Sequence, residues 1–296
     1  MFSLWILHVV EFSRQLYGGN YGNRIGIGLS SIFNMDDSWE LGEAYEIFMG
    51  RWSRPMAREF VRWLGPAPNG RWLDVGCGTG ALSELIGQMA APQQVTGVDF
   101  SAGFIRHARQ SHPETVYDFQ VGSALDLSAG DGTFDVVVSG LALNFFPDVE
   151  MAVRQMYRVA KKGGTVAIYV WDYATGMEML RYFWDVAAVL DPQAGGLDEG
   201  HRFPICQPEP LQALLSQVGL ENVVVEVLET TAVFRDFADY WQPFLGRNGP
   251  APSYVAALAP TQQMTLAEQL RQLLPSQPDG SIPLKMRAWA VRGEKA

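Results

Sequence analysis

Cysteine is scarce in this chain, which has 296 residues but only two cysteines, Cys77 and Cys206. Two cysteines allow one disulfide at most, so a small disulfide-stapled fold is excluded. Such sparse cysteine is typical of proteins in a reducing compartment, and it predicts free thiols and a cytoplasmic location. The sequence also lacks an HExxH motif and any cluster of Cys and His, so nothing in it supports a metal site.

Basic residues and long hydrophobic runs are also few. Lysine and arginine total 22 against 32 aspartates and glutamates, which gives a formal net charge of -10. This surplus repels a phosphate backbone, so nucleic acid is not an expected partner. The apolar run at residues 2–10 is far shorter than the roughly 20 residues needed to cross a bilayer. We therefore expect no integral membrane contact.

The first 34 residues show no sustained helical or strand period. After the short apolar run, the segment YGGNYGNRIGIGLSS is rich in Gly, Asn and Ser, which is typical of a loop. A secretory signal would need a basic region before the apolar run and a small-residue cleavage site after it, and neither is visible. We hypothesise that residues 1–34 are a loose extension and that Met35 opens the functional chain.

What the chain does have is a globular composition, with 48% hydrophobic and 12% aromatic residues, so disorder is excluded as a description of the whole. Between residues 39 and 64, aromatic and aliphatic positions are closely spaced, arginines recur at helical intervals, and Gly65 and Pro66 follow. This pattern predicts one or two amphipathic helices in an N-terminal helical segment, residues 35–64.

Residues 65–171 alternate between short apolar runs and helical stretches. Strands are predicted at 72–75, 95–99, 116–121, 134–139 and 165–171, and helices at 81–90, 101–109 and 148–160. Strands separated by helices favour parallel pairing through right-handed crossovers, and therefore an α/β doubly wound sheet. Ligands of such sheets bind at the carboxyl ends of the strands.

The rest of the chain predicts two further strands and two insertions. Residues 208–229 complete the core with a helix at 210–219 and a sixth strand at 222–228, and residues 285–296 form a seventh strand, at 286–291, and a tail. The segments 172–207 and 230–284 are predicted as helical caps over a substrate, although they could equally seal a sheet edge or a dimer contact. In the second cap, Thr265 to Glu268 resemble a capping box that opens a helix. Its expected apolar side consists of Leu266, Leu270, Leu273 and Leu274.

The first strand-to-helix turn, LDVGCGTG, carries the strongest local signal. Gly76, Gly78 and Gly80 let the backbone turn sharply and let a ligand approach the helix N-terminus. A tight loop or a dinucleotide site would explain the glycines too. Asp74 favours a third interpretation, because a carboxylate at the strand end opposes a pyrophosphate and attracts an ammonium or sulfonium group.

A second acidic residue, Asp99, ends the strand in the segment VTGVDF. A carboxylate at this strand tip can accept hydrogen bonds from both hydroxyls of a ribose. The alternative is an ordinary helix N-cap, a role for which Ser101 competes. At this spacing from LDVGCGTG, Asp99 favours a nucleoside ligand.

At these residues the sequence resembles the class I S-adenosylmethionine-dependent methyltransferases, and within that class the group called methyltransferase type 11. It is particularly similar to bacterial small-molecule members of the ubiquinone/menaquinone-biosynthesis group. The resemblance rests on LDVGCGTG, GVDFS, FDVVVSGLALNFFPD and YRVAKKGGTVAIYVW, and it covers approximately residues 45–171. It implies the family's Rossmann-like fold and S-adenosyl-L-methionine as cofactor.

The resemblance also assigns residues to parts of the cofactor. It implies that the ribose lies on Asp99, one adenine face on Phe100, and the adenine edge near Ser123 and Ala124, where many members carry Asp in place of Ser. The remaining cofactor residues fall into three groups: the methionine site, Asp74, Gly76, Cys77, Gly78 and Gly80; the pocket edge, Ser139, Gly140 and Leu141; and the closure over the carboxylate, Tyr45 and Arg51.

On the substrate side, the expected pocket residues are Asn144, Phe145, Trp171, Tyr182 and Trp241. In-line methyl transfer needs mainly positioning and exclusion of water. A base is required only when the acceptor must lose a proton. His201 is the candidate base, and its alternative is a packed or exposed loop histidine.

The predicted activity is methyl transfer to a small, apolar or aromatic metabolite. Nucleic-acid methylation is disfavoured, because neither the (Asn/Asp)-Pro-Pro-aromatic turn nor the Pro-Cys nucleophile of related families is present. Three alternatives stay open: an aminopropyl transferase on the same fold, a cofactor-binding regulatory or interaction module without catalysis, and an NAD-dependent oxidoreductase, which Asp74 opposes. We expect a monomer or a homodimer.

Overall fold

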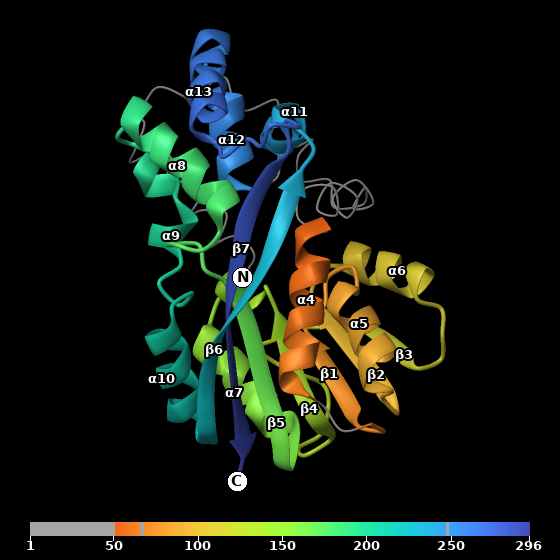
Figure 1. Ribbon diagram of the computed structural model, residues 1–296. Helices are drawn as coiled ribbons and strands as arrows, with labels where there is room; N and C mark the ends of the chain where they lie inside the picture. Colours follow the sequence, from red (N-terminus) through yellow and green to blue (C-terminus); the bar gives the residue numbers. More distant parts are fainter. Residues whose placement is uncertain (1–50, 66–67, 247–248) are drawn as a thin grey trace, which may run out of the picture. The chain divides into compact units, whose positions relative to one another are not determined.

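Seven strands form one open sheet in the order β3-β2-β1-β4-β5-β7-β6 (Figure 1). The computed structural model describes residues 51–65, 68–246 and 249–296. The first five strands run parallel, and β7 is antiparallel to both of its neighbours, β5 and β6. The predicted mostly parallel, seven-stranded α/β fold is therefore confirmed. The strands are β1 (Arg71–Val75), β2 (Gln94–Asp99), β3 (Tyr117–Val121), β4 (Phe134–Gly140), β5 (Ala160–Trp171), β6 (Leu220–Phe234) and β7 (Ile282–Lys295).

The direction in which strands are added reverses between β1 and β4. The chain runs outward from β1 to β2 and β3, and then returns to place β4 on the other side of β1. Leu73 pairs with Thr96 of β2 on one side and with Val137 of β4 on the other. In open α/β sheets a ligand site lies beyond the carboxyl ends of the strands at such a reversal. The turns after β1 and β4 are therefore the expected position of a ligand site.

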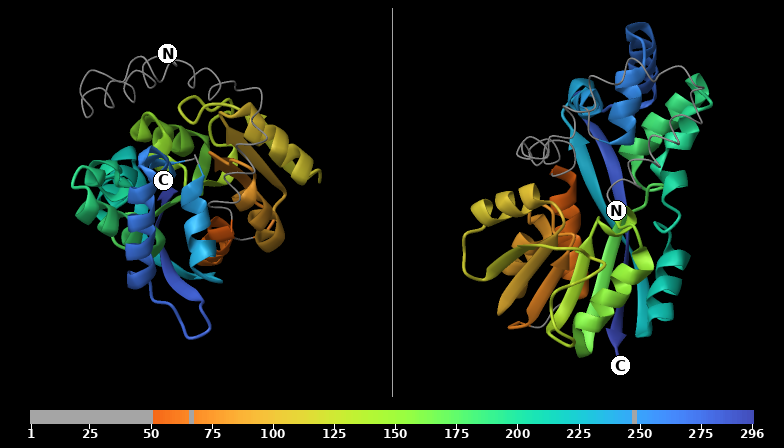
Figure 2. Two further views of the ribbon diagram at one scale, coloured as in Figure 1. Left: turned by 90° about the horizontal axis from the view of Figure 1, so that it is seen from above. Right: turned by 180° about the vertical axis from the view of Figure 1, so that it is seen from behind.

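Helices cover both faces of the sheet, and the central strands are accordingly apolar along most of their length. Val137, Val166 and Ile168 have no exposed surface. Helices α4, α5 and α6 lie on one face and α7 and α10 on the other (Figures 1 and 2). Their bounds are α4 (Arg51–Leu64), α5 (Ala81–Ala90), α6 (Ala102–Ser111), α7 (Val149–Val159) and α10 (Pro208–Val218).

A layer of further helices lies at one end of the sheet, where β6 and β7 extend past β5 (Figure 1). The last residue of β5, Trp171, pairs with Ala288, whereas the β6–β7 ladder continues to Phe234 and Ile282. Helix α8 contacts α12 and α13 in this layer. The short elements are η3 (Leu143–Phe145), η4 (Ala194–Leu197), α9 (Glu199–Arg202), α11 (Phe237–Trp241) and η5 (Gln242–Leu245), and the longer ones are α8 (Glu178–Leu190), α12 (Pro250–Ala257) and α13 (Pro260–Leu273).

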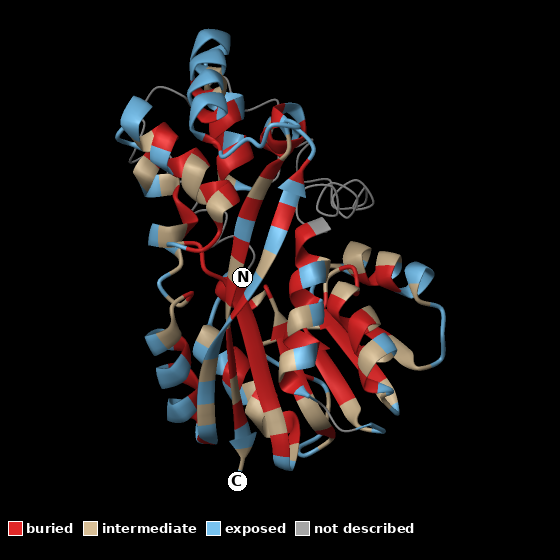
Figure 3. Ribbon diagram, viewed as in Figure 1, coloured by how far each residue is buried: buried red, intermediate tan, exposed pale blue. Residues whose placement is uncertain are grey.

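Three sequence predictions in this region are wrong in detail. Strands β6 and β7 are longer than predicted, because each continues as the partner of the other. Helix α13 begins at Pro260, where the Gln262 side chain accepts the backbone N–H of Ala259 at 2.9 Å, so Thr265 lies inside the helix. Leu273 is exposed, unlike the other three leucines of its predicted apolar side (burial is shown in Figure 3).

Several predictions fall outside the described part of the chain. They are the loose extension at residues 1–34, the start at Met35 and the role of Tyr45. Arg51 begins α4, but its side chain is also outside what the structure describes. Within the described ranges, no helix combines the length and apolar character needed to span a membrane. Both cysteines are buried and free.

Candidate functional site

Two features of the turn between β1 and α5, the glycine turn, require glycine: positive φ angles and a close contact with a neighbouring loop. Gly76, Gly78 and Gly80 all adopt positive φ angles, at 77°, 54° and 91°. A Cβ on residue 76 would lie 2.6 Å from the Cβ of Ala142, so the β4–α7 loop packs directly on the turn. At Gly78, by contrast, no heavy atom of the described chain lies within 4 Å of the Cβ position. Among the described residues, the turn therefore leaves space at Gly78 for a ligand.

Asp74 is buried beside this turn with half of its carboxylate unpaired. Its Oδ2 accepts a hydrogen bond from the Ser83 hydroxyl at 2.7 Å, whereas Oδ1 has no partner in the described part of the chain. Burial raises the pKa of Asp74 to about 7, and the nearby charge of Asp99 adds to the effect. A cationic ligand group would stabilise the ionised form and supply the missing partner.

Asp99 joins the end of β2 to the glycine turn. Its Oδ2 accepts the backbone N–H of Gly78 at 3.0 Å and its Oδ1 that of Ser101 at 2.9 Å. Burial raises the pKa of Asp99, although these two hydrogen bonds oppose the rise. Ser101 is the N-cap of α6 and accepts the N–H of Phe104. The helix is therefore capped by Ser101, and each Asp99 oxygen retains a lone pair for a further donor.

The predicted adenine residues gather around the ends of β2 and β3. Phe100, next to Asp99, is 68% exposed. The N–H of Gly122 donates to the Asp99 carbonyl at 2.9 Å, which holds the two strand ends together. Ser123 is exposed, and its hydroxyl accepts the N–H of Leu125 at 3.1 Å; Ala124 is half-buried. The structure thus brings these residues to one corner of the sheet.

Cys77 lies within the turn, but its thiol is expected to be unreactive. Its side chain is buried. Burial raises the pKa of the thiol well above its usual range, and the charges of Asp74 and Asp99 add to this. A thiol of that kind stays protonated and is a poor nucleophile.

The end of β4 is held tightly and carries a second unpaired group. The Ser139 hydroxyl is buried and has no partner among the described residues. A Cβ at Gly140 would lie 2.7 Å from a ring carbon of Tyr169, so only glycine fits there. Leu141 has a left-handed backbone with φ 57°, and its N–H donates to the Tyr169 carbonyl at 2.8 Å. Such strained backbone is concentrated at functional sites.

Two predicted substrate residues follow on η3. Asn144 is 9% exposed, and neither Oδ1 nor Nδ2 of its amide has a partner in the described chain. Phe145 is 63% exposed, and its ring centroid lies 5.4 Å from that of Phe203 in an edge-on contact. Phe203 in turn contacts Tyr173 at 5.7 Å. An apolar surface therefore adjoins an unpaired amide.

The other predicted substrate residues lie deeper. Trp171 is buried in the core at the end of β5. Tyr182 is half-buried on α8 and packs against the core, and Trp241 stacks on Phe237 at 6.2 Å within α11. These positions belong to the helical layer and its contact with the sheet.

His201 lies on the surface of α9, with 76% of its side chain exposed. Its Nδ1 is 3.1 Å from the carbonyl oxygen of Gly195. Because a carbonyl can only accept, this nitrogen is the protonated one in that contact. Its role as a base stays a prediction.

Sequence reasoning missed two features around α9. The Arg181 guanidinium makes a two-pronged ion pair with buried Asp198, which also accepts the N–H of Gly200 at 2.8 Å. The indole N–H of Trp184 donates to Glu199 at 2.6 Å, and burial raises the pKa of that carboxyl. No local pattern signals the contacts of Arg181 and Trp184, because each joins α8 to a residue at least 15 positions away.

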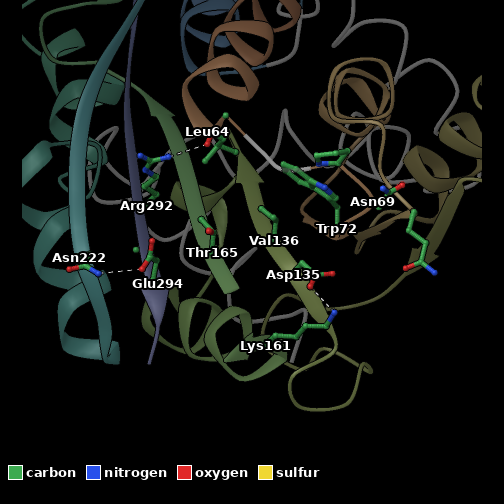
Figure 4. A pocket seen from close by; sticks show the side chains of 15 residues that line it. Leu64, Asn69, Trp72, Asp135, Val136, Lys161, Thr165, Asn222, Arg292 and Glu294 are labelled. Atoms are coloured by element: carbon green, nitrogen blue, oxygen red, sulfur yellow. Dashed lines mark hydrogen bonds and ion pairs between the residues drawn. The ribbon is translucent and has the colours of Figure 1, made fainter. Parts of the chain in front are cut away.

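A hollow of about 580 Å³ lies at the amino ends of the parallel strands, at the opposite end of the sheet from the glycine turn (Figure 4). Residues at the beginnings of β1 and β4 and at the end of antiparallel β7 line it. Two pairs of its polar groups contact one another: Lys161 pairs with Asp135 at 2.7 Å, and Asn222 donates to Glu294 at 3.3 Å. The indole N–H of Trp72, which also lines it, has no partner among the described residues. The hollow is remote from the unpaired groups at the carboxyl ends of the strands. In the described part of the chain, no cluster of three or more His, Cys, Asp or Glu residues is arranged to hold a metal.

Several known proteins of similar sequence are methyltransferases. The family described as a methyltransferase domain matches residues 73–168. A ubiquinone/menaquinone biosynthesis C-methyltransferase of Geotalea daltonii is 32% identical over 188 residues, which cover 57% of this chain and 78% of that protein. A 2-phytyl-1,4-naphtoquinone methyltransferase of Synechococcus elongatus is 37% identical over 116 residues, or 38% of this chain. The chain spans about half the length of this last relative.

Solved structures show the same fold. The phosphoethanolamine N-methyltransferase 2 of Haemonchus contortus, solved with S-adenosyl-L-methionine, superposes with a TM-score of 0.53 at 17% identity and covers 86% of this chain and 56% of its own. The chain belongs to the class I S-adenosylmethionine-dependent methyltransferases, because it is 32% identical to the Geotalea daltonii methyltransferase over 78% of that protein. Within that class it is similar to the quinone-biosynthesis methyltransferases.

Proposed function

We propose that this protein transfers a methyl group from S-adenosyl-L-methionine to a small aromatic acceptor of the quinol type. The observation that carries the proposal is the pair of buried carboxylates, Asp74 and Asp99, beside a glycine turn that is open at Gly78. When bound, the cofactor supplies an electrophilic methyl group on a sulfonium. The protein's own residues have to bind it, orient it and exclude water.

The described residues fit the cofactor in charge and in hydrogen-bonding capacity. Asp74 has an unpaired oxygen for the ammonium of the methionine part. Asp99 keeps lone pairs for two ribose hydroxyls, and its backbone hydrogen bonds hold it in position for them. The exposed ring of Phe100 is available to one face of the adenine. A dinucleotide would instead bring its pyrophosphate to the glycine turn beside the carboxylate of Asp74.

The acceptor class is supported by the relatives and by the surface beside η3. Two relatives are named for methylation in quinone biosynthesis or of a naphthoquinone. The exposed ring of Phe145, in contact with Phe203, offers an aromatic acceptor a face or an edge against which to pack. The helical layer formed by α8 and α11–α13 would then act as the cap of this site.

Calorimetric titration with S-adenosylhomocysteine and, separately, with NADH tests the cofactor assignment. We expect the wild type to bind S-adenosylhomocysteine, and Asp99→Ala to bind it at least tenfold more weakly, because charged hydrogen bonds contribute about 1.5–3 kcal/mol each. Asp118→Ala, which removes a half-buried carboxylate near the start of neighbouring β3, is the matched control and should bind normally. Binding of NADH in place of S-adenosylhomocysteine would overturn the proposal.

A turnover assay tests the reaction class once cofactor binding is established. We expect radiolabelled methyl to pass from S-adenosylmethionine to 1,4-naphthohydroquinone or a 2-alkyl derivative. Transfer of a labelled aminopropyl group from the decarboxylated donor to a polyamine would show an aminopropyl transferase instead. Cofactor binding without turnover of any quinol, phenol, amine or thiol would indicate a non-catalytic module.

A further inference from the structure

The amide of Asn144 is buried without a hydrogen-bond partner in the described chain, and this arrangement requires an explanation. Both Oδ1 and Nδ2 are inaccessible and unpaired, so up to two donors and one acceptor group are unsatisfied. Buried polar groups in folded proteins are nearly always paired, because an unpaired one retains the full cost of its desolvation. A side chain that served only packing at this position would be apolar.

The loop that carries the amide is held in place. Leu141 holds a left-handed backbone, and its N–H is bonded to the Tyr169 carbonyl. Within η3 the N–H of Phe145 donates to the Ala142 carbonyl at 3.0 Å. The Cβ of Ala142 fills the place that a side chain on Gly76 would need. The segment that carries Asn144 is therefore packed against the glycine turn.

The chemistry of the neighbouring groups indicates which ligand the amide serves. The ammonium of the methyl donor is matched by the carboxylate of Asp74, and its ribose hydroxyls are matched by Asp99. Asn144 has no charge and offers both a donor and an acceptor, which suits a neutral hydroxyl or carbonyl oxygen. The next residue, Phe145, exposes an aromatic ring. Amide and ring together fit an apolar ring that bears an oxygen substituent.

We propose that Asn144 binds the ring oxygen of the methyl acceptor, an inference that rests on the proposed methyltransferase function. Nδ2 donates a hydrogen bond to that oxygen, and Oδ1 accepts a hydrogen bond from its hydroxyl while the oxygen is protonated. The donated hydrogen bond strengthens if the oxygen becomes anionic, because charge-assisted hydrogen bonds are about twice as strong as neutral ones. The amide thereby selects oxygenated rings over plain hydrocarbons and orients the ring relative to the donor.

The variant Asn144→Leu separates this role from a structural one. Leucine has the same branching at Cγ as asparagine and lacks the polar atoms, so the ligand-free variant should melt at least about 2 °C higher than the wild type. Gln155→Leu is the matched control, because its amide oxygen accepts from Leu127 and Arg158. That variant should melt at a lower temperature. A lower melting temperature for Asn144→Leu would show a structural role and overturn the inference.

Two titrations complete the test. S-adenosylhomocysteine should bind wild type and Asn144→Leu within about twofold of one another, because the amide does not contact the donor. With the donor site saturated and oxygen excluded, 1,4-naphthohydroquinone should bind Asn144→Leu at least about tenfold more weakly than the wild type.

The possible failures are distinguishable. If the wild type binds no S-adenosylhomocysteine, the proposed function itself fails. The wild type could instead bind S-adenosylhomocysteine but not naphthohydroquinone, or Asn144→Leu could bind naphthohydroquinone as tightly as the wild type does. In either case the assignment of Asn144 fails while the methyltransferase function stands. A parallel loss of S-adenosylhomocysteine affinity would assign the amide to the donor and also overturn the inference.

Discussion

Gly76 and Ala142 belong to turns on neighbouring strands and touch so closely that no side chain fits on residue 76. A Cβ added there would lie 2.6 Å from that of Ala142, and the backbone of Gly76 is left-handed as well. This contact packs the β4–α7 loop, which carries Asn144, against the glycine turn. The two parts of the candidate site, the glycine turn and the β4–α7 loop, are therefore in direct contact.

We expect Gly76→Ala to lower the free energy of unfolding by roughly 2–5 kcal/mol. The left-handed backbone costs a residue with a Cβ about 1–2 kcal/mol, and overpacking against Ala142 adds about 1–3 kcal/mol. Gly78→Ala is the matched control, because it shares the left-handed backbone but its Cβ would meet no neighbour among the described residues. Urea unfolding measures both, and equal losses for the two variants would contradict the steric contribution.

Cofactor affinity should depend on pH through Asp74. Because burial raises its pKa to about 7, this group favours the folded ligand-free protein below its unfolded pKa. That contribution is lost as the pH rises through about 7. Ligand binding has the opposite sign, because only the ionised carboxylate attracts an ammonium group. We expect the affinity for S-adenosylhomocysteine to weaken as the pH falls below about 7.

Calorimetric titrations between about pH 5.5 and 8.5 check this dependence. In Asp74→Asn the affinity should be lower and should change less with pH, with the residual slope arising from Asp99, whose pKa is also raised. An unchanged slope in the variant would assign the pH dependence to another group.

The ion pair of Arg181 with Asp198 should be important for the stability of the helical layer. Both side chains are largely buried, and Asp198 also holds the N-terminus of α9. Arg181→Met leaves a buried carboxylate unpaired, which typically costs about 3–5 kcal/mol. Arg154→Met removes an exposed pair with Glu150 on α7 and should cost less than about 1 kcal/mol. Comparable losses in urea unfolding would show that the Arg181 pair is not effectively buried.

Phe100 should contribute to cofactor binding and little to folding. Its ring is exposed at the end of β2, so Phe100→Ala should leave the melting temperature nearly unchanged. Loss of stacking on the adenine, about 0.5–1.5 kcal/mol, should weaken S-adenosylhomocysteine binding roughly two- to tenfold. Val189→Ala, at another exposed apolar position, is the control. Unchanged affinity in Phe100→Ala would remove Phe100 from the site.

The sequence predicted the local parts of the fold well. The helix at 81–90 has the predicted bounds, and the first four strands lie within about one residue of theirs, because apolar periodicity and turn glycines act over a few neighbouring residues. Strands β6 and β7 were underestimated. The parts that were missed at their outer ends, 229–234 and 282–285, pair with each other across an insertion.

The amino-acid sequence by itself determined the glycine turn, the two acidic strand ends and the alternation of strands and helices, since each depends on local backbone preferences. Only the tertiary structure decided that Ser101, rather than Asp99, caps α6, that Ala142 packs on Gly76, and that the Asn144 amide is buried without a partner in the described chain. These features bring together atoms from separate strands or loops. Their formation is set by the packing of the whole sheet, which no local pattern records.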